Sequence, residues 1–313
     1  MAFAPSKETY AGKVYSVTIG SSPQEIAFGG ESVLPFHSFE GPTPHRPVIA
    51  YEIQDIPPSD WPEEVQKPYK DVSHDPAVWA KFCQDTLKAR ALALRLLGTH
   101  PDRENRSPED AATTVRNVLD AVSIPLFILG SNHAEKDAPV LIAAAEAAKD
   151  RNCVIGKAQE ANYKTIAAAA MANNHKLIAM SELDINLSKQ LNILITQMGF
   201  EKERIITDPM CSALGYGLEY TYSVMERIRL AALTQNDATM QQPILGDVGM
   251  YVWKVKETQA DEADVPQWGG LEERGVAWEA MTATALLMSG AELLIMRHPK
   301  AVAAVEKVIE ELV

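Results

Sequence analysis

The chain has 313 residues, of which 46% are hydrophobic and 23% charged, proportions typical of one large globular α/β domain or two small ones. Its formal net charge of −13 would repel a phosphate backbone, which argues against nucleic-acid binding. No apolar run reaches the ~18 residues of a membrane span, the first residues lack the apolar core of a signal peptide, and the three cysteines are scattered. We therefore expect a cytoplasmic protein without disulfides.

Residues 1–44 are expected to form a short antiparallel β extension. Residues 13–20 alternate like a strand, and residues 24–28 and 32–36 could pair with it across turns rich in glycine, serine and proline. Such an extension could plug the amino-terminal end of a larger domain or cover a partner surface.

Residues 45–313 follow a different rhythm, in which short apolar runs alternate with amphipathic helix-like runs. The strand-like runs are 47–53, 91–97, 124–130, 153–158, 176–181, 204–209, 243–248 and 292–298. Eight strand-plus-helix units in this length predict a closed parallel (β/α)8 TIM barrel. The strand runs are apolar throughout, as expected of strands buried on both faces.

Helix ends and long loops can also be read from the residue pattern. Ser107 before Pro108 predicts a capped helix start, and Asp184 can cap a helix that Gly199 ends in the left-handed conformation. Two long connections, 55–76 and 247–272, carry several aromatic residues and prolines. Both would lie on the face where a barrel concentrates its chemistry, so we expect ordered loops that pack on something.

The predicted carboxyl ends of the strands are rich in neutral amides and hydroxyls. That composition suits hydrogen bonding to a large polar ligand, and the sequence has no HExxH, GxSxG or phosphate-binding glycine loop. We therefore assign no catalytic residue and no metal ligand.

Some residues near the strand ends have alternative interpretations. Arg297 needs an anionic partner, for which Asp208 or Asp247 could serve as easily as a ligand phosphate. Lys157 could act as a strand-end lysine in an aldolase-type barrel. Cys153 begins a strand and is expected in the core.

Several stretches resemble a known family: 34-LPFHSFEG, 46-RPVIAYEIQDI, 182-ELDINLSKQLNILI, 204-RIITDPMCSALGYGLEYTYSVMERIRLAAL and 294-LIMRHP. They are similar to the small subunit of the corrinoid/iron–sulfur protein and to the delta subunit of the acetyl-CoA decarbonylase/synthase complex. The resemblance runs from about residue 10 to the C-terminus, and the 182–233 block is its most specific part.

This resemblance implies a TIM barrel that acts as a non-catalytic subunit in the reductive acetyl-CoA pathway. It implies a heterodimer with a large subunit that carries a [4Fe–4S] cluster and a cobalamin-binding domain, with the corrinoid between that domain and this barrel. A separate methyltransferase would bring the methyl group from methyltetrahydrofolate, acetyl-CoA synthase would receive it, and a reductive activator would bind transiently. The absence of a four-cysteine motif and of a DxHxxG signature fits the small-subunit role.

Geometry alone suggests which strand-end residues contact the corrinoid. They are Asn132, Gln159, Ser181, Asn186, Asp208, Gly215, Tyr216 and Met250. The alternative function is a methyltetrahydrofolate-dependent methyltransferase on a related barrel, in which Asp208, Asn186 or Asn132 would hold the pterin.

Overall fold

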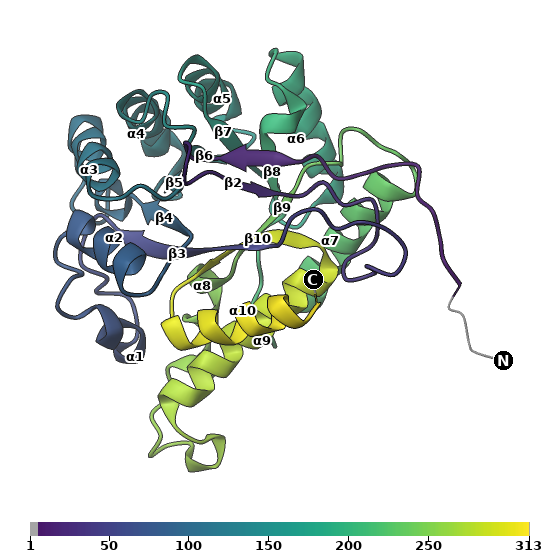
Figure 1. Cartoon of the computed structure of the whole chain (residues 1–313). Coiled ribbons are helices and arrows are strands. Elements are labelled where there is room, and N and C mark those ends of the chain that lie inside the picture. The colour runs from purple at the N-terminus through teal and green to yellow at the C-terminus, as the bar shows by residue number, and fades with distance from the viewer. Residues whose placement is uncertain (1–5, 313) are drawn as a thin grey trace.

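The computed structural model describes residues 6–312, and its eight parallel strands close into a barrel in the order β10-β3-β4-β5-β6-β7-β8-β9, with the helices outside (Figure 1). The barrel strands are β3 (Val48–Gln54), β4 (Ala91–Arg95), β5 (Leu126–Leu129), β6 (Val154–Ala158), β7 (Lys176–Met180), β8 (Ile205–Asp208), β9 (Ile244–Asp247) and β10 (Ala291–Met296). Each lies within one of the eight apolar runs or overlaps it, which confirms the predicted (β/α)8 barrel.

Ten α-helices are assigned among the described residues. They are α1 (Glu63–Gln66), α2 (Pro76–Asp85), α3 (Pro108–Ala121), α4 (Ala134–Ala147), α5 (Tyr163–Ala172), α6 (Ile185–Gln197), α7 (Leu218–Leu233), α8 (Val248–Val252), α9 (Leu271–Ser289) and α10 (Pro299–Leu312). Eight of these follow the barrel strands as its outer layer, whereas α1 and α8 are short helices in the two long loops. Within residues 6–312, no helix is long and apolar enough to cross a membrane.

Apolar side chains fill both sides of the barrel wall. Seven of the eight strands are buried at every position, because one face packs on the helices and the other points into the barrel. Neighbouring strands are staggered. The third residue of β3, Ala50, lies opposite the first residue of β4, Ala91, and the second residue of β4, Leu92, lies opposite the first residue of β5, Leu126. Such a stagger tilts the strands and lets the sheet close on itself.

A two-stranded hairpin closes the amino-terminal end of the barrel. Strands β1 (Val17–Ile19) and β2 (Ile26–Phe28) pair antiparallel, and their side chains join the cluster of apolar residues inside the barrel. Asn152, in the loop before β6, fixes the hairpin by donating hydrogen bonds to the carbonyls of Thr18 and Gly20 at 3.1 and 3.0 Å. The predicted β extension is confirmed, but residues 32–36 form turns instead of a third strand, and residues 1–5 lie outside the described part.

The predicted helix ends are confirmed. Ser107 and Asp110 form a reciprocal capping box at the start of α3, and the Asp184 carboxylate accepts the first amides of α6. Gly199, with φ of 89°, follows the last turn of α6 in the left-handed conformation that glycine tolerates without strain.

The long loops pack on the chain itself. Trp61 and Tyr69 of the first loop form an aromatic cluster with Trp79 of α2, with ring centroids 5.1–6.2 Å apart. In the second loop, Trp253 is buried and stacks on His298 at 5.8 Å. The expectation of ordered loops is confirmed.

Candidate functional site

Six charged side chains meet inside the barrel just below its carboxyl-terminal mouth, and we call them the ion-pair layer. They are Glu52 on β3, Arg95 on β4, Lys157 on β6, Asp208 on β8, Asp247 on β9 and Arg297 directly after β10. Every one of them is at least 95% buried. Three cations face three carboxylates, so the formal charges balance, as buried charges require.

Lys157 lies at the centre of one half of this layer. Its Nζ is 2.7 Å from Asp247 Oδ2 and 2.8 Å from Asp208 Oδ2. Burial alone would lower the pKa of Lys157, but the two carboxylates outweigh burial and raise the pKa above its ordinary value. The amine therefore stays protonated and is not the free nucleophile that an aldolase lysine must be.

Glu52 holds the other half. Arg95 donates from Nε to Glu52 Oε1 at 3.2 Å and also reaches Asp247, while Arg297 Nη2 lies 2.9 Å from the same Glu52 oxygen. Burial would raise the pKa of Glu52, but the guanidinium groups of Arg297 and Arg95 outweigh it and hold the pKa below its ordinary value. The anionic partner of Arg297 is therefore Glu52, not Asp208 or Asp247, and its guanidinium lies 4.6 Å from the Trp61 ring centroid.

A buried glutamate on α9 fixes the end of β10. Glu279 accepts the backbone amides of Arg297 and His298 at 2.6 and 3.0 Å. Burial raises the pKa of Glu279 to about 7, although both amide bonds act in the opposite direction. Glu279 is absent from the residues that the sequence predicts for the site, because its signal is weak: it is one acid among the apolar residues in the middle of α9.

Buried acceptors also hold the loops around the mouth. Asp137 on α4 accepts the backbone amides of Ser131 and Asn132 at 2.8 and 2.9 Å, and the Ser131 hydroxyl at 2.7 Å. These bonds keep Asn132 at a φ of 69°, in the left-handed region that costs energy for a residue with a side chain. The loop after β5 therefore has a fixed shape.

The loops after β7 and β8 are bound to each other. Ser181 donates its amide to the Asp208 carbonyl at 3.0 Å, and Leu183 donates to the Pro209 carbonyl at 2.8 Å. Leu183 and Met210 both have positive φ, 61° and 68°. Strained backbone persists only where its surroundings determine it, so this side of the mouth is also preorganised.

The structure brings some of the predicted contact residues together. Asn132 and Met250 approach across the mouth, with Asn132 Nδ2 3.4 Å from Met250 Sδ. Gln159 lies 3.8 Å from the Met180 sulfur, and both line an open groove of about 360 Å³ that also includes Leu187. Asp208 and Ser181 lie below this surface, buried in or beside the ion-pair layer.

Three predicted residues lie further out. Asn186 is exposed in the first turn of α6. Gly215 and Tyr216 are in the loop before α7, where Leu214 is hydrogen bonded to Thr282 and Trp278 of α9. The structure therefore does not bring all eight residues into one cluster, and their contact with a cofactor stays a prediction.

The expectation of a neutral polar mouth is only partly met. Asn132, Gln159 and Met250 are uncharged, but the exposed Glu160 and Glu182 line the same groove as Gln159, and the ion-pair layer lies beneath. Arg95 and Lys157 carried the signal: two cations in strands buried on both faces require carboxylates from other strands.

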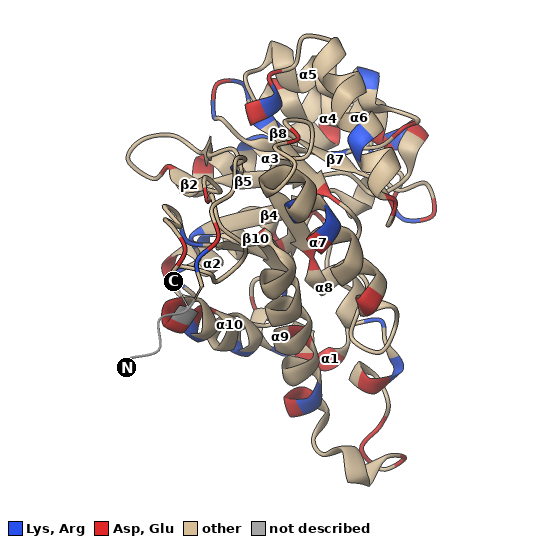
Figure 2. Cartoon of the chain, turned by 90° about the vertical axis from the view of Figure 1, so that its right-hand side faces the viewer, with Lys and Arg blue, Asp and Glu red and all other residues tan. Residues whose placement is uncertain are grey.

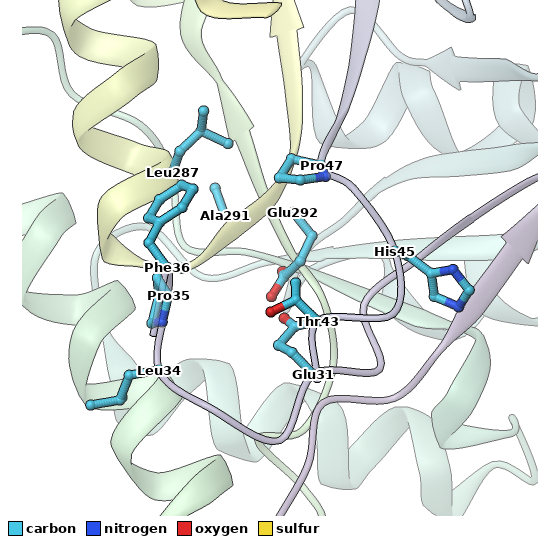
Figure 3. Close-up of a pocket in the computed structure, with 11 residues that line it drawn as sticks. Glu31, Leu34, Pro35, Phe36, Thr43, His45, Pro47, Leu287, Ala291 and Glu292 are labelled. Atoms are coloured by element: carbon cyan, nitrogen blue, oxygen red, sulfur yellow. The ribbon is translucent and has the colours of Figure 1, made fainter. Parts of the chain in front are cut away.

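A different cavity lies at the opposite end of the barrel, between the N-terminal extension and β10 (Figure 3). Its volume is about 40 Å³, and apolar residues such as Phe36 and Leu287 line it. Glu31 and Glu292 point toward one another in it, and Arg229 pairs with Glu292 at 2.6 Å. We regard it as the seam between the extension and the barrel, because the extension itself forms one wall.

Other TIM barrels of known structure share this fold. It is similar to dihydropteroate synthase from Vibrio fischeri ES114 (TM-score 0.58, 12% identity, covering 94% of this chain and 97% of that one). It is also similar to dihydropteroate synthase from Xanthomonas albilineans (TM-score 0.57, 13% identity, covering 95% and 97%). At these identities the likeness shows the TIM-barrel fold alone.

The sequence defines the family. The model of the CO dehydrogenase/acetyl-CoA synthase delta subunit family matches residues 16–308, and the chain belongs to this family. The acetyl-CoA decarbonylase/synthase complex subunit delta of Methanothermobacter thermautotrophicus is 34% identical over 310 residues, covering 98% of this chain and 78% of that protein. The subunit of the same name from Archaeoglobus fulgidus is also 34% identical, over 99% of this chain and 71% of that protein. The resemblance noted from the sequence is confirmed.

Proposed function

We propose that this chain is the small subunit of a heterodimeric corrinoid/iron–sulfur methyl carrier, and that its barrel mouth covers the upper face of a corrinoid held by the large subunit. Methyl transfer would run from methyltetrahydrofolate, through this carrier, to acetyl-CoA synthase. The [4Fe–4S] cluster and the corrinoid-binding domain would belong to the large subunit. A methyltransferase, acetyl-CoA synthase and a reductive activator would dock in turn.

One observation carries the proposal: the interior of the mouth is filled by the chain's own ion-pair layer. The shortest pair, Lys157 to Asp247 at 2.7 Å, and the bond from Arg95 to Asp247 cross the barrel and leave its centre occupied. A ligand must therefore lie on top of the mouth, not inside it. A flat macrocycle owned by another subunit has the shape for such a surface.

The residues at the surface fit that use. Asn132 and Gln159 present amides and Met250 of α8 a thioether, and the buried Ser181 hydroxyl below them has no partner among the described residues. When bound, the corrinoid supplies the cobalt that accepts and passes on the methyl group. The chain would exclude water and oxidants from the upper face and would leave room for a methyl group.

The chain also offers little that would compete with a methyl carrier. Burial raises the pKa of all three cysteine thiols, and that of Cys153 reaches about 12. Lys157 is held protonated between two carboxylates. Neither Lys157 nor these thiols is therefore a free nucleophile that would compete for the methyl group.

A second candidate is a pterin-dependent methyltransferase, and the likeness to dihydropteroate synthases favours it. In one of those structures the protein is in complex with 7,8-dihydropteroate. The ion-pair layer weighs against it, because a pterin entering the barrel would have to displace Lys157 or Arg95 from Asp247. Isothermal titration of the chain with methyltetrahydrofolate separates the two functions: sub-millimolar binding by the chain alone supports the second candidate.

The experiment for the first candidate is co-expression with the large subunit. The corrinoid absorption should remain with the large subunit, and the isolated chain should hold none. Replacing both Asn132 and Gln159 by alanine should shorten the lifetime of the reduced corrinoid in the heterodimer, whereas Gln190→Ala on the exposed side of α6 should not. Stoichiometric corrinoid on the isolated chain, or an unchanged lifetime in the double variant, would contradict the proposal.

A further inference from the structure

The outer surface of α7 and α9 has the composition of an interface. The two helices run side by side and face the viewer in Figure 2, where α9 is tan over most of its length beyond its charged first turn. Its outward stripe repeats at helical spacing as the exposed Ala277, Met281 and Met288 and the half-buried Thr284, without a charge. Met281 and Met288 are 58% and 42% exposed, so large apolar side chains face solvent in a chain whose net charge is −13.

The apolar surface continues from α9 onto α7 and the N-terminal extension. Met288 shares a cavity of about 260 Å³ with Tyr222 and Leu230 of α7 and with Leu34 of the extension, and Glu226 and Arg229 of α7 also line it. Leu230 is itself 42% exposed. We call this continuous surface, formed by the α9 stripe and the residues around the cavity, the α7/α9 face. Its cavity could accept one projecting apolar side chain.

The two helices that carry this face are long enough to form a large part of an interface. Helices of 16 and 19 residues are about 24 and 28 Å long at about 1.5 Å per residue, and each is about 10 Å across. Their joint footprint is on the order of 500 Å² before the extension is added. A standard interface buries about 800 Å² of accessible surface per partner, which is the same order.

The charges around the face decide between two occupants. Glu219 and Glu226 on α7 and Glu273 on α9 are exposed, against the single exposed cation Arg227 on these helices. A two-fold contact with a second copy would bring the same acids against each other, in addition to the repulsion between two chains of charge −13. A partner with an apolar ridge bordered by lysine and arginine fits better.

We propose that the α7/α9 face is the permanent attachment site for the companion subunit, which presents such a ridge. This inference rests on the proposed function, because it takes the corrinoid-bearing large subunit as the companion. Attachment on the barrel's side would leave the mouth uncovered, so the corrinoid domain could move onto it and away while the two subunits stay joined.

The test measures binding of the purified chain to the large subunit by sedimentation and by titration. The double variant Leu230→Glu, Met281→Glu should weaken binding at least about tenfold, because it places charges at the centre of an apolar contact. Ile142→Glu is the matched control. Ile142 is 42% exposed on α4, which follows β5, and β5 lies opposite β9, the strand that precedes α9. All three positions are exposed, so the melting temperature of the isolated chain should not change.

Three results would overturn the inference. Wild-type binding by the double variant would do so, as would an equal loss in the Ile142→Glu control. A chain that dimerises by itself, and whose dimer the double variant dissociates, would assign the face to a second copy.

Hydrogen exchange at residues 131–133 and 181–184 keeps this inference separate from the proposed function. If these loops are protected in the complex and the double variant still binds normally, the partner covers the mouth but attaches somewhere other than the α7/α9 face. If the double variant loses binding and these loops are not protected in the wild-type complex, the partner attaches at the α7/α9 face but does not cover the mouth.

Discussion

Replacement of Lys157 by methionine tests whether the ion-pair layer is as tightly coupled as its geometry indicates. Methionine has a similar length and no charge, so the change leaves Asp208 buried with no cation beside it and leaves Asp247 with Arg95 alone. Removing one partner of a buried pair costs about 3–5 kcal/mol, because the remaining charge keeps its desolvation penalty. We expect a loss of stability in this range.

The control is an ion pair at the surface with a similar distance between nitrogen and oxygen. Lys189 lies 2.6 Å from Asp237, as close as the buried pair, but its side chain is 50% exposed. Water screens such a pair, so Lys189→Met should cost about 0–1 kcal/mol. The contrast isolates burial, since the distances are nearly equal.

Urea unfolding of the full chain, followed by circular dichroism and intrinsic fluorescence, gives both free energies. The double variant Lys157→Met, Asp208→Asn should recover part of the loss, because it no longer leaves a buried carboxylate without a cation. A loss for Lys157→Met no larger than that for Lys189→Met would refute the view that the layer is dry and coupled.

Other consequences concern pH, helix capping and thiol reactivity. Because the pKa of Glu279 rises from its ordinary 4.5 to about 7, the folded chain binds this proton more tightly than the unfolded chain does. The proton contributes about 3 kcal/mol to the free energy of unfolding below pH 4.5, and this contribution is lost as the pH rises through 7. The free energy of unfolding of Glu279→Gln should lack this decline, and parallel pH profiles for variant and wild type would be inconsistent with the assignment. Asp184 accepts the amides of Asn186 and Leu187 at 2.7 and 3.2 Å, so Asp184→Ala should cost about 1 kcal/mol in urea unfolding and Asp184→Asn much less; equal costs would argue against capping. All three cysteines are buried with raised thiol pKa values, so a disulfide-exchange reagent should label none in the native chain and all three after unfolding; rapid labelling of the native chain would disagree.

The barrel could be predicted from the sequence because its signal is repeated and local. Each strand is a short apolar run and each helix an amphipathic one, so eight units confirm one another even where single boundaries shift by a few residues. Caps such as Ser107 and Asp184 are local too. Residues 32–36 were harder, because alternation alone does not say whether a neighbouring strand is present, and this segment packs as turns.

The mouth was less predictable because its order depends on residues far apart in the chain. Arg95 and Asp247 are 152 positions apart, and Arg297 and Glu52 are 245 apart. No periodicity reports such a pairing, so the sequence predicts each strand-end charge separately and does not predict the layer. The supports of the loops, Asp137 and Glu279, lie on helices and act through backbone amides, which a reading of strand ends does not include.

Hydrogen exchange of the intact heterodimer against the isolated chain tests the central claim most directly, since it shows which end of the barrel the corrinoid-bearing partner covers. We predict slowed exchange in four segments that surround the mouth, 131–133, 159–162, 181–184 and 248–251. Protection confined to the β1–β2 hairpin and the cavity beside Glu31, with the four mouth segments exchanging as in the free chain, would contradict it.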